Sequence, residues 1–380
     1  MANVLTDLAA DIYKAADIVG RELVGFIPSV TINAGAERAA FGDTVRSHFT
    51  RTPTVNTSYS PSMTIPEGDD QTVDNKTMTI DKVANIQIPW TGEDIRHVNN
   101  GSGFETIYGD QIAQAMRSIT NAIEAEVGSV LYKGASRAVG AAGTNPFASN
   151  FDVVADARKV LEDNGCPMDG RITMVCNTAA TAAMRKLAQL QKANESASDA
   201  LLRRGELLDL QGVMIKGSGG VASHTKGTGS GYLINGGDAV GDETITVDTG
   251  AGTILAGDVI THASDSTNKY VVNTALSGGD FVIGSPGLLV AAADNDAVTV
   301  GDGYAANVAF HQAAVELVAR APEQPFGGDA AIDRMTVQDT FSGLVYEVAV
   351  YKGYGKAMID VTTFYAAKVW KPDFVTTVMG

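Results

Sequence analysis

The sequence predicts an α+β chain in which a β-rich segment is inserted into a body that mixes helices and strands. Three observations indicate this: a long helical pattern over 104–135, alternating helix and strand patterns over 151–195, and recurring short strand patterns over 217–305. At 380 residues the chain is too long for one ordinary core, and 44% hydrophobic residues suffice to bury several. We therefore expect roughly two or three domains.

Residues 3–20 carry apolar side chains at the spacing of an amphipathic helix, among them Leu5, Leu8 and Ile12. Gly20 follows this pattern and ends it. The apolar face is too thin to bury itself. We therefore expect this N-terminal helix to dock on the body of its own chain or on another chain.

The next segment predicts an extended β-hairpin. FGDTVRSHFTRTP (41–53) indicates a turn and a short strand, and over 54–88 strand patterns flank the acidic turn EGDD at 67–70. Apolar residues alternate with polar ones on the second flank, at Met78, Ile80, Ile86 and Ile88. Because an isolated hairpin is marginally stable in water, we expect this one to lie on a neighbouring surface.

The longest helical pattern runs over 104–135 and carries one continuous apolar stripe, formed by Ile112, Ala115, Met116, Ile119, Ala122, Ile123, Val127, Val130 and Leu131. A helix of ~28 residues is ~42 Å long. Such a rod needs a flat surface to pack on.

An α/β alternation follows the long helix. It predicts a helix over 151–164 ended by Gly165, a buried strand over 171–177 and a second helix over 178–195.

The composition then changes sharply over 217–305. This segment holds 18 of the 41 glycines and lacks Arg, Met and Trp. It contains two lysines, Lys226 and Lys269, and ten acidic residues. Turn residues separate seven candidate strands, at 231–235, 243–248, 257–261, 268–273, 280–284, 287–291 and 297–301. This spacing is typical of a small antiparallel barrel or sandwich, and we expect an autonomous inserted domain.

The main body resumes after the insertion. Apolar residues over 306–328 change phase, which predicts two extended pieces with a kink near His311. The remaining segment predicts a β-meander with a turn at Ser342–Gly343.

The candidate chemical residues do not form a catalytic or metal-binding pattern. His262 has Asp258 and Asp265 nearby, but metal sites need more ligands at regular spacing, so we interpret these residues as a turn or exposed strand. His311 is interpreted as a histidine hydrogen-bonded at a bend. No residue is expected to be catalytic, to bind a metal or to bind a cofactor.

The net charge and the cysteine content also limit the expected function and location. The net charge of -16 argues against nucleic-acid binding as the main role. The two cysteines, Cys166 and Cys176, are expected to be reduced thiols, and neither a signal peptide nor a membrane-spanning segment is expected.

The order of these parts resembles the major capsid (coat) protein of tailed bacteriophages, a fold shared with the herpesvirus capsid floor. GDTVRSHFTRTP with the following hairpin resembles the family's extended loop, and FETIYGDQIAQAMRSITNAIEAEVGSVLY resembles the spine helix of its peripheral domain. DARKVLEDNGCPMDGRITMVCNTAATAAM resembles the helix–strand–helix of its axial domain. AGDVITHASDSTNKYVVNTALSGGDFVIGSPGL resembles the β-barrel inserted in coat proteins of short-tailed phages.

This resemblance implies a division of the chain into an N-terminal arm (1–40), extended hairpin loop (41–90), peripheral domain (91–150), first part of the axial domain (151–216), inserted barrel (217–305) and closing β segments (306–380). It implies pentamers and hexamers in an icosahedral virion capsid around double-stranded DNA that is not bound sequence-specifically. It also implies a scaffolded procapsid that expands, a portal at one vertex, a cement protein in some shells, and assembly in the bacterial cytoplasm.

Two alternatives stay open at this point: an extracellular β-rich adhesin, and an α/β enzyme with a β accessory domain. In the capsid interpretation, the contacts between subunits are expected from Glu67, Asp69 and Asp70 at the hairpin tip and from Leu5, Leu8 and Ile12 in the arm.

Overall fold

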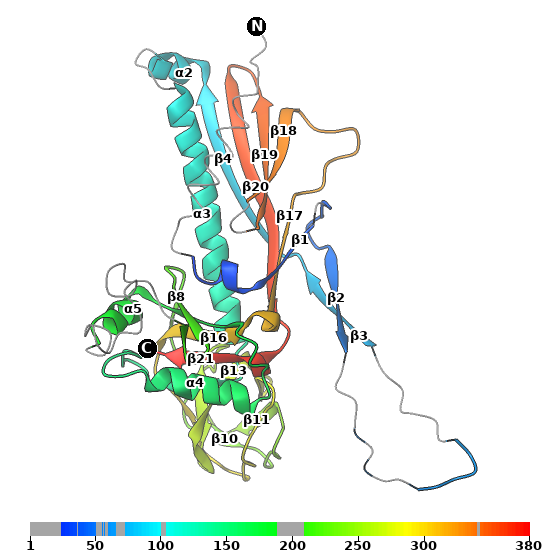
Figure 1. The fold of residues 1–380 in the computed structure, drawn as a ribbon, viewed down its shortest axis with the longest axis vertical. Helices are drawn as coiled ribbons and strands as arrows, with labels where there is room; N and C mark the ends of the chain where they lie inside the picture. The colour runs from blue at the N-terminus through cyan, green and yellow to red at the C-terminus, as the bar shows by residue number, and fades with distance from the viewer. Residues whose placement is uncertain are drawn as a thin grey trace.

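A computed structural model describes residues 24–35, 37–50, 55, 57, 60–65, 73–99, 104–187, 209–339 and 343–380. The helix predicted over 3–20 lies outside these residues. Figure 1 shows an elongated part, built on one helix and one sheet, that continues into a rounder part containing the C-terminus, while a hairpin projects to the side.

The elongated part contains a six-stranded sheet. Its central strand β20 (Lys356–Val369) pairs with β4 (Lys82–Thr91) along one edge. The other edge of β20 pairs with β17 (Val315–Arg320) and β19 (Val345–Lys352), which in turn pair with β1 (Thr31–Ala34) and β18 (Ala331–Gln338). The short helix α2 (Gly92–Asn99) connects β4 to the long helix.

The long helix α3 (Phe104–Lys133) confirms the helix predicted over 104–135. Its apolar stripe is fully buried at Ile112, Met116, Ile123, Val127 and Leu131. The flat surface that such a rod requires is the six-stranded sheet, since α3 contacts β20 and β4. Within the described residues, none of the helices combines the length and apolarity needed to cross a bilayer.

The projecting hairpin is formed by β2 (Thr44–Thr50) and β3 (Val73–Thr79), which are antiparallel (Figure 1). The prediction of a turn and strand within 41–53 is confirmed. The bounds of the hairpin predicted over 54–88 are wrong, because Ile86 and Ile88 belong to β4 in the six-stranded sheet. The buried Ile80 lies between β3 and β4. Apolar and polar residues alternate in both strands, so the sequence pattern does not show that one strand ends and another begins there.

The rounder part contains a 13-stranded sheet that brings together segments far apart in sequence. Its centre is β16 (Tyr304–His311), flanked by β6 (Ile172–Cys176) and β21 (Val375–Met379). Beyond these lie β5 (Arg137–Gly140), β8 (Val213–Gly217) and β7 (Asp209–Leu210).

The predicted helix–strand–helix of this part is largely confirmed. Helix α4 (Asp152–Asp163) precedes Gly165, which has a positive φ of 74°, and β6 is buried throughout. Helix α5 (Thr178–Arg185) starts at Asn177, whose side chain accepts a hydrogen bond from the Ala180 N–H. The helix predicted over 178–195 is too long, because α5 ends at Arg185 and Lys186 is its C-cap; residues 188–195 lie outside the described residues.

The insertion forms a closed antiparallel barrel. The strand order is β10 (Leu233–Ile234), β11 (Thr244–Asp248), β14 (Asp280–Ile283), β13 (Asp265–Ser277), β12 (Val259–His262) and β15 (Val298–Val300). A bridge between Leu233 and Ala297 returns the ring to β10. The barrel has its own core, which includes Tyr270, Phe281 and Ile245.

The insertion is also tied to the body, since β13 pairs with β5 and β9 (Ser223–His224) pairs with β16. One of its predicted strands, 287–291, is wrong: this segment is a loop that begins at Gly287 with a positive φ of 80°. Leu288 is buried in the barrel core, whereas Leu289 and Val290 are exposed to solvent.

The kink predicted near His311 is confirmed by the turn η2 (Gln312–Ala314) between β16 and β17. The predicted closing meander is confirmed for β18, β19 and β20, although Ser342 of its predicted turn lies outside the described residues. After the turn η3 (Pro372–Phe374), however, β21 leaves the meander and joins the other sheet.

Candidate functional site

The histidine singled out in the sequence lies in the barrel wall. His262 is on β12 and is 3% exposed, so the expectation of an exposed strand is wrong. Its Nδ1 lies 3.4 Å from Asp296 Oδ2, and its ring stacks on Tyr270. Asp265, the first residue of β13, accepts hydrogen bonds from the Tyr270 hydroxyl and from the backbone N–H of Thr267 and Asn268, directly after the turn at 263–264.

Asp258 forms a contact that its place in the sequence does not reveal. Its Oδ1 lies 2.8 Å from Nε2 of His224, and both side chains are buried. The same carboxylate accepts hydrogen bonds from the backbone N–H of Gly227 and Leu255. The pair therefore joins the start of the insertion to the barrel. No local signal could have found it, because 34 residues separate the two side chains.

His311 lies at the bend, as predicted, and uses both ring nitrogens. Its Nδ1 accepts a hydrogen bond from the Ala313 N–H, and its Nε2 lies 2.9 Å from Oδ1 of Asp169. The hydrogen bond from His311 lowers the pKa of Asp169. Across the ranges that the structure describes, no three side chains of His, Cys, Asp or Glu are grouped to hold a metal ion.

The sequence interpretation missed Glu124, which is buried on the apolar side of α3. Its Oε1 accepts hydrogen bonds from the backbone N–H of Gly25 and Phe26 at 2.6 and 2.7 Å, and its Oε2 accepts one from Ile27 at 2.9 Å. The Ser218 hydroxyl also donates to Oε1, at 2.6 Å. The one sign of it in the sequence is an acidic residue at a helix position that falls among the buried positions Thr120, Ile123 and Val127.

This carboxylate fixes the path of the chain as it reaches the body. Phe26 is fully buried and stacks on Phe310 of β16, with ring centroids 6.4 Å apart. Gly128 of α3 is required beneath it, because a Cβ there would lie 2.8 Å from the Phe26 ring. The turn η1 (Ile27–Ser29) and β1 follow directly.

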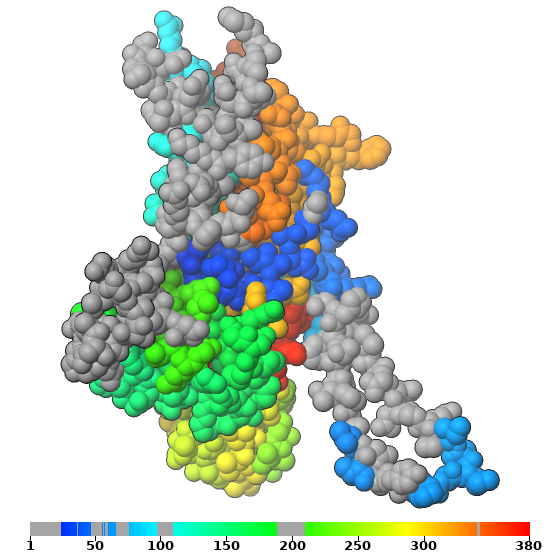
Figure 2. All heavy atoms as spheres, viewed as in Figure 1, coloured from blue at the N-terminus to red at the C-terminus, as the bar shows by residue number. Residues whose placement is uncertain are grey.

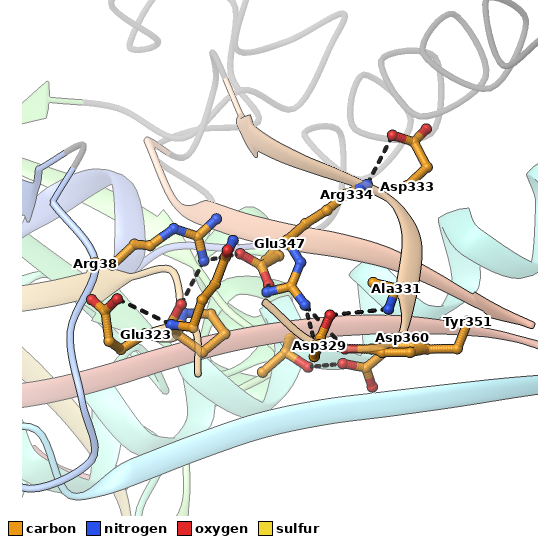
Figure 3. A network of polar contacts seen from close by, with 12 residues as sticks. Arg38, Glu323, Asp329, Ala331, Asp333, Arg334, Glu347, Tyr351 and Asp360 are labelled. Atoms are coloured by element: carbon orange, nitrogen blue, oxygen red, sulfur yellow. Dashed lines mark hydrogen bonds and ion pairs between the residues drawn. The ribbon is translucent and has the colours of Figure 1, made fainter. Parts of the chain in front are cut away.

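A second polar network holds the segment after β1 against the six-stranded sheet (Figure 3). Glu347 on β19 lies between two guanidinium groups, 2.5 Å from Arg38 and 3.0 Å from Arg334. Arg334 also pairs with Asp329, which accepts a hydrogen bond from the Tyr351 hydroxyl at 2.8 Å. Hydrogen bonds from the Ala331 N–H and from Tyr351 lower the pKa of Asp329.

Large apolar side chains are exposed on segments that project from this body. In the loop between β2 and β3, Met63 and Ile65 are 105% and 90% exposed. Phe326, between β17 and β18, and Tyr354, between β19 and β20, are exposed to the same degree. Figure 2 shows described parts of the hairpin loop, in blue, set apart from the body. Single exposed apolar side chains are ordinary, but Met63 and Ile65 lie together on one projecting segment, which makes that segment a candidate contact surface.

The contact residues expected from the sequence cannot be placed on this surface. Glu67, Asp69 and Asp70, like Leu5, Leu8 and Ile12, lie outside the described residues. Met63 and Ile65 are close in sequence to the acidic turn, but the sequence interpretation did not single them out.

Comparison with known proteins identifies the fold. No family model matches the chain, and no curated protein sequence matches it. Among solved structures, the capsid structure of cyanophage P-SCSP1u matches with a TM-score of 0.51 and 12% identity, covering 94% of this chain and 88% of that one. A structure of Mycobacterium phage Che8 matches with a TM-score of 0.48 and 16% identity, covering 89% of this chain and 84% of that one. The mature capsid of bacteriophage PhiM1 matches with a TM-score of 0.47 and 12% identity, covering 94% of this chain and 86% of that one.

The match to the cyanophage capsid shows that this chain has the fold of a phage capsid protein. The fold predicted from the sequence is therefore confirmed, with its extended hairpin, long helix and mixed α/β part.

Proposed function

We propose that this chain is the major capsid protein of a tailed bacteriophage, a non-enzymatic subunit that assembles into an icosahedral shell of pentamers and hexamers around double-stranded DNA. The capsid-protein fold supports this proposal. The observation that carries it furthest is the pair Met63 and Ile65, exposed on a loop that projects from the body. Covering these side chains requires another surface, and in a shell that surface belongs to a neighbouring copy.

The acidic turn at the hairpin tip extends the same proposal. Glu67, Asp69 and Asp70 pair with basic side chains of the neighbouring subunit, and Leu5, Leu8 and Ile12 add an apolar contact from the N-terminal arm. The domain division expected from the sequence, with residues 217–305 as an inserted barrel, belongs to the proposal too. The barrel core of Tyr270, Phe281 and Ile245 supports it.

The remaining partners follow from the proposed class of protein. A scaffolding protein directs assembly of a procapsid in the bacterial cytoplasm, a portal occupies one vertex, and a cement protein is an optional addition. The shell encloses DNA without sequence-specific contacts. The net charge of -16 fits a wall that repels the DNA backbone instead of gripping it.

Assembly of the purified chain, followed by sedimentation velocity and electron microscopy, tests the proposal. Wild type should form closed particles. The double variant Met63→Ser/Ile65→Ser should assemble far less, since two apolar side chains that are no longer buried cost about 3 kcal/mol per contact, roughly 100-fold in association. The triple variant Glu67→Gln/Asp69→Asn/Asp70→Asn should also lower particle yield, with circular dichroism unchanged.

The matched control is Val240→Ser, which removes an apolar side chain that is 63% exposed on the barrel instead of on the hairpin. This variant should assemble as wild type does. The proposal is wrong if wild type stays monomeric under all assembly conditions, co-expression with a scaffolding protein included, or if the Met63/Ile65 variant yields as many particles as the control.

A further inference from the structure

A cavity of about 300 Å³ lies where the insertion meets the body, between β5, α4 and β13. Its polar lining consists of Arg137, Asp156, Lys159, Thr267, Asn268 and Lys269. Two strands and one helix, from different parts of the sequence, therefore contribute to one small polar site. Neither the fold nor the proposed shell function explains it.

The charge of this lining is opposite to that of the chain. Arg137, Lys159 and Lys269 oppose a single carboxylate, Asp156, whereas the whole chain has a net charge of -16. Lys269 is also one of only two basic residues in the segment 217–305. Excess positive charge inside an acidic protein favours binding of an anion.

Arg137 provides the strongest reason for a ligand. The residue is 4% exposed, and its Nη2 donates to Oδ1 of Asn164 at 2.6 Å and to the Val160 carbonyl at 3.3 Å. Its buried Nε has no hydrogen-bond partner among the described residues, and Asp163 acts on this guanidinium electrostatically without a direct ion pair between the two side chains. A buried guanidinium without a direct ion pair is costly, and burial lowers the pKa of Arg137.

The two lysines of the lining come from different elements. Lys269, on β13, is half-buried, and its Nζ donates to the Gly140 carbonyl of β5 without a carboxylate partner in the described chain. Lys159, on α4, is exposed and pairs with Asp163 at 2.7 Å, so its charge is partly balanced outside the cavity. Asp163 also acts on Arg137 electrostatically and opposes the lowering of its pKa by burial.

We propose that this cavity binds a free phosphate-class oxyanion. Two cations without carboxylate partners match the charge of a phosphate dianion, and Arg137 and Lys269 are the side chains that form strong charge-assisted hydrogen bonds to such oxygens. Thr267 and Asn268 complete the polar lining, and the Asn268 amide is held by its hydrogen bond to Oδ2 of Asp265 at 2.9 Å. The bound anion connects β5, α4 and β13, and so stabilises the junction between the insertion and the body. A rigid duplex cannot enter a cavity of this size.

Thermal unfolding of the full, unassembled chain tests this site independently of shell assembly. Inorganic phosphate should raise Tm in a saturable manner compared with sodium chloride at equal ionic strength, because a ligand that binds only the folded state stabilises it. Isothermal titration calorimetry on the same samples gives Kd. Lys269→Met should weaken phosphate binding about tenfold or more, the effect of losing one charge-assisted hydrogen bond.

The control is Lys226→Met, which removes the other lysine of the insertion. Lys226 pairs with Asp302 at 2.6 Å, and it does not line the cavity. Phosphate binding should be unchanged in this variant. A short DNA duplex at the same concentration of phosphate groups should not compete with free phosphate.

Three results would overturn the proposal: no saturable rise in Tm beyond that in chloride, equal phosphate affinity in Lys269→Met and Lys226→Met, or binding of the duplex in place of free phosphate. Arg137→Gln provides a second check if Lys269→Met misfolds, because it retains a hydrogen-bonding side chain at the buried position while removing the charge. This variant should bind phosphate more weakly still, and unchanged affinity counts against the site.

Discussion

Replacing Glu124 with glutamine should destabilise the chain by about 4 kcal/mol, although the two side chains have nearly the same shape. Both carboxylate oxygens are acceptors in the native structure: Oε1 receives three hydrogen bonds and Oε2 receives one, from the Ile27 N–H. A glutamine amide has only one acceptor oxygen. Its best orientation keeps that oxygen on the three-donor side and turns the NH₂ group toward Ile27.

The magnitude follows from these contacts. The buried Ile27 N–H loses its partner, which costs about 1–3 kcal/mol. The remaining three hydrogen bonds lose their charge assistance, at roughly 0.5–1 kcal/mol each. The total is a large fraction of the 5–15 kcal/mol by which typical domains are stable. Glu124→Ala should cost more, because it leaves all four donors unpaired.

Urea denaturation of the unassembled chain measures this effect, and Glu126→Gln is the matched control. Glu126 lies two residues away on α3, is 32% exposed and forms an ion pair with Lys82 at 3.5 Å. Its replacement should change the free energy of unfolding by less than about 0.5 kcal/mol. If Glu124→Gln unfolds at the same urea concentration as Glu126→Gln, the carboxylate does not anchor residues 25–27 in the way argued above.

Two further predictions concern acid stability and the insertion. His311 lowers the pKa of Asp169, so this carboxylate stabilises the fold above the ordinary Asp pKa of 3.8, and the contribution is lost as the pH falls through the lower folded value. Asp169→Asn should therefore flatten the loss of stability below about pH 4 in acid titrations followed by fluorescence, and an unchanged curve would contradict the pairing. The fragment 213–306, expressed alone, should show a cooperative thermal transition by circular dichroism, because the ring of strands closes and has its own core. A random-coil spectrum would show that the barrel needs its contacts with β5 and β16.

The elements with strong local patterns could be predicted from the sequence. The apolar stripe of α3 runs from Ile112 to Leu131, and β6 is a short apolar run between turn residues, so each pattern identifies one element. The kink at His311 was visible as a change of phase. The pairing of β3 and β4 with different partners was not visible, because alternation shows that a strand has two faces and does not show which strand lies beside it.

The polar contacts could not be predicted for a related reason. Glu124 meets donors that lie 97 to 99 residues earlier in the chain, and Glu347 lies between Arg38 and Arg334. Such groups are brought together by sheet topology, which a single sequence does not encode in any short motif. The only local signal is a charge at a position that should be apolar, and its partner remains unknown until the fold is known.

The two buried acids have one property in common that bears on assembly. Glu124 holds residues 25–27 against α3, and Glu347 holds Arg38 against β19, so the chain is fastened on both sides of β1. A segment that is held at two buried points leaves the body at a fixed place and in a fixed direction. The hairpin that follows, with Met63 and Ile65 exposed, therefore projects from a defined site. Less ordering entropy is then lost when another surface covers it, which would favour the proposed association of copies in a shell.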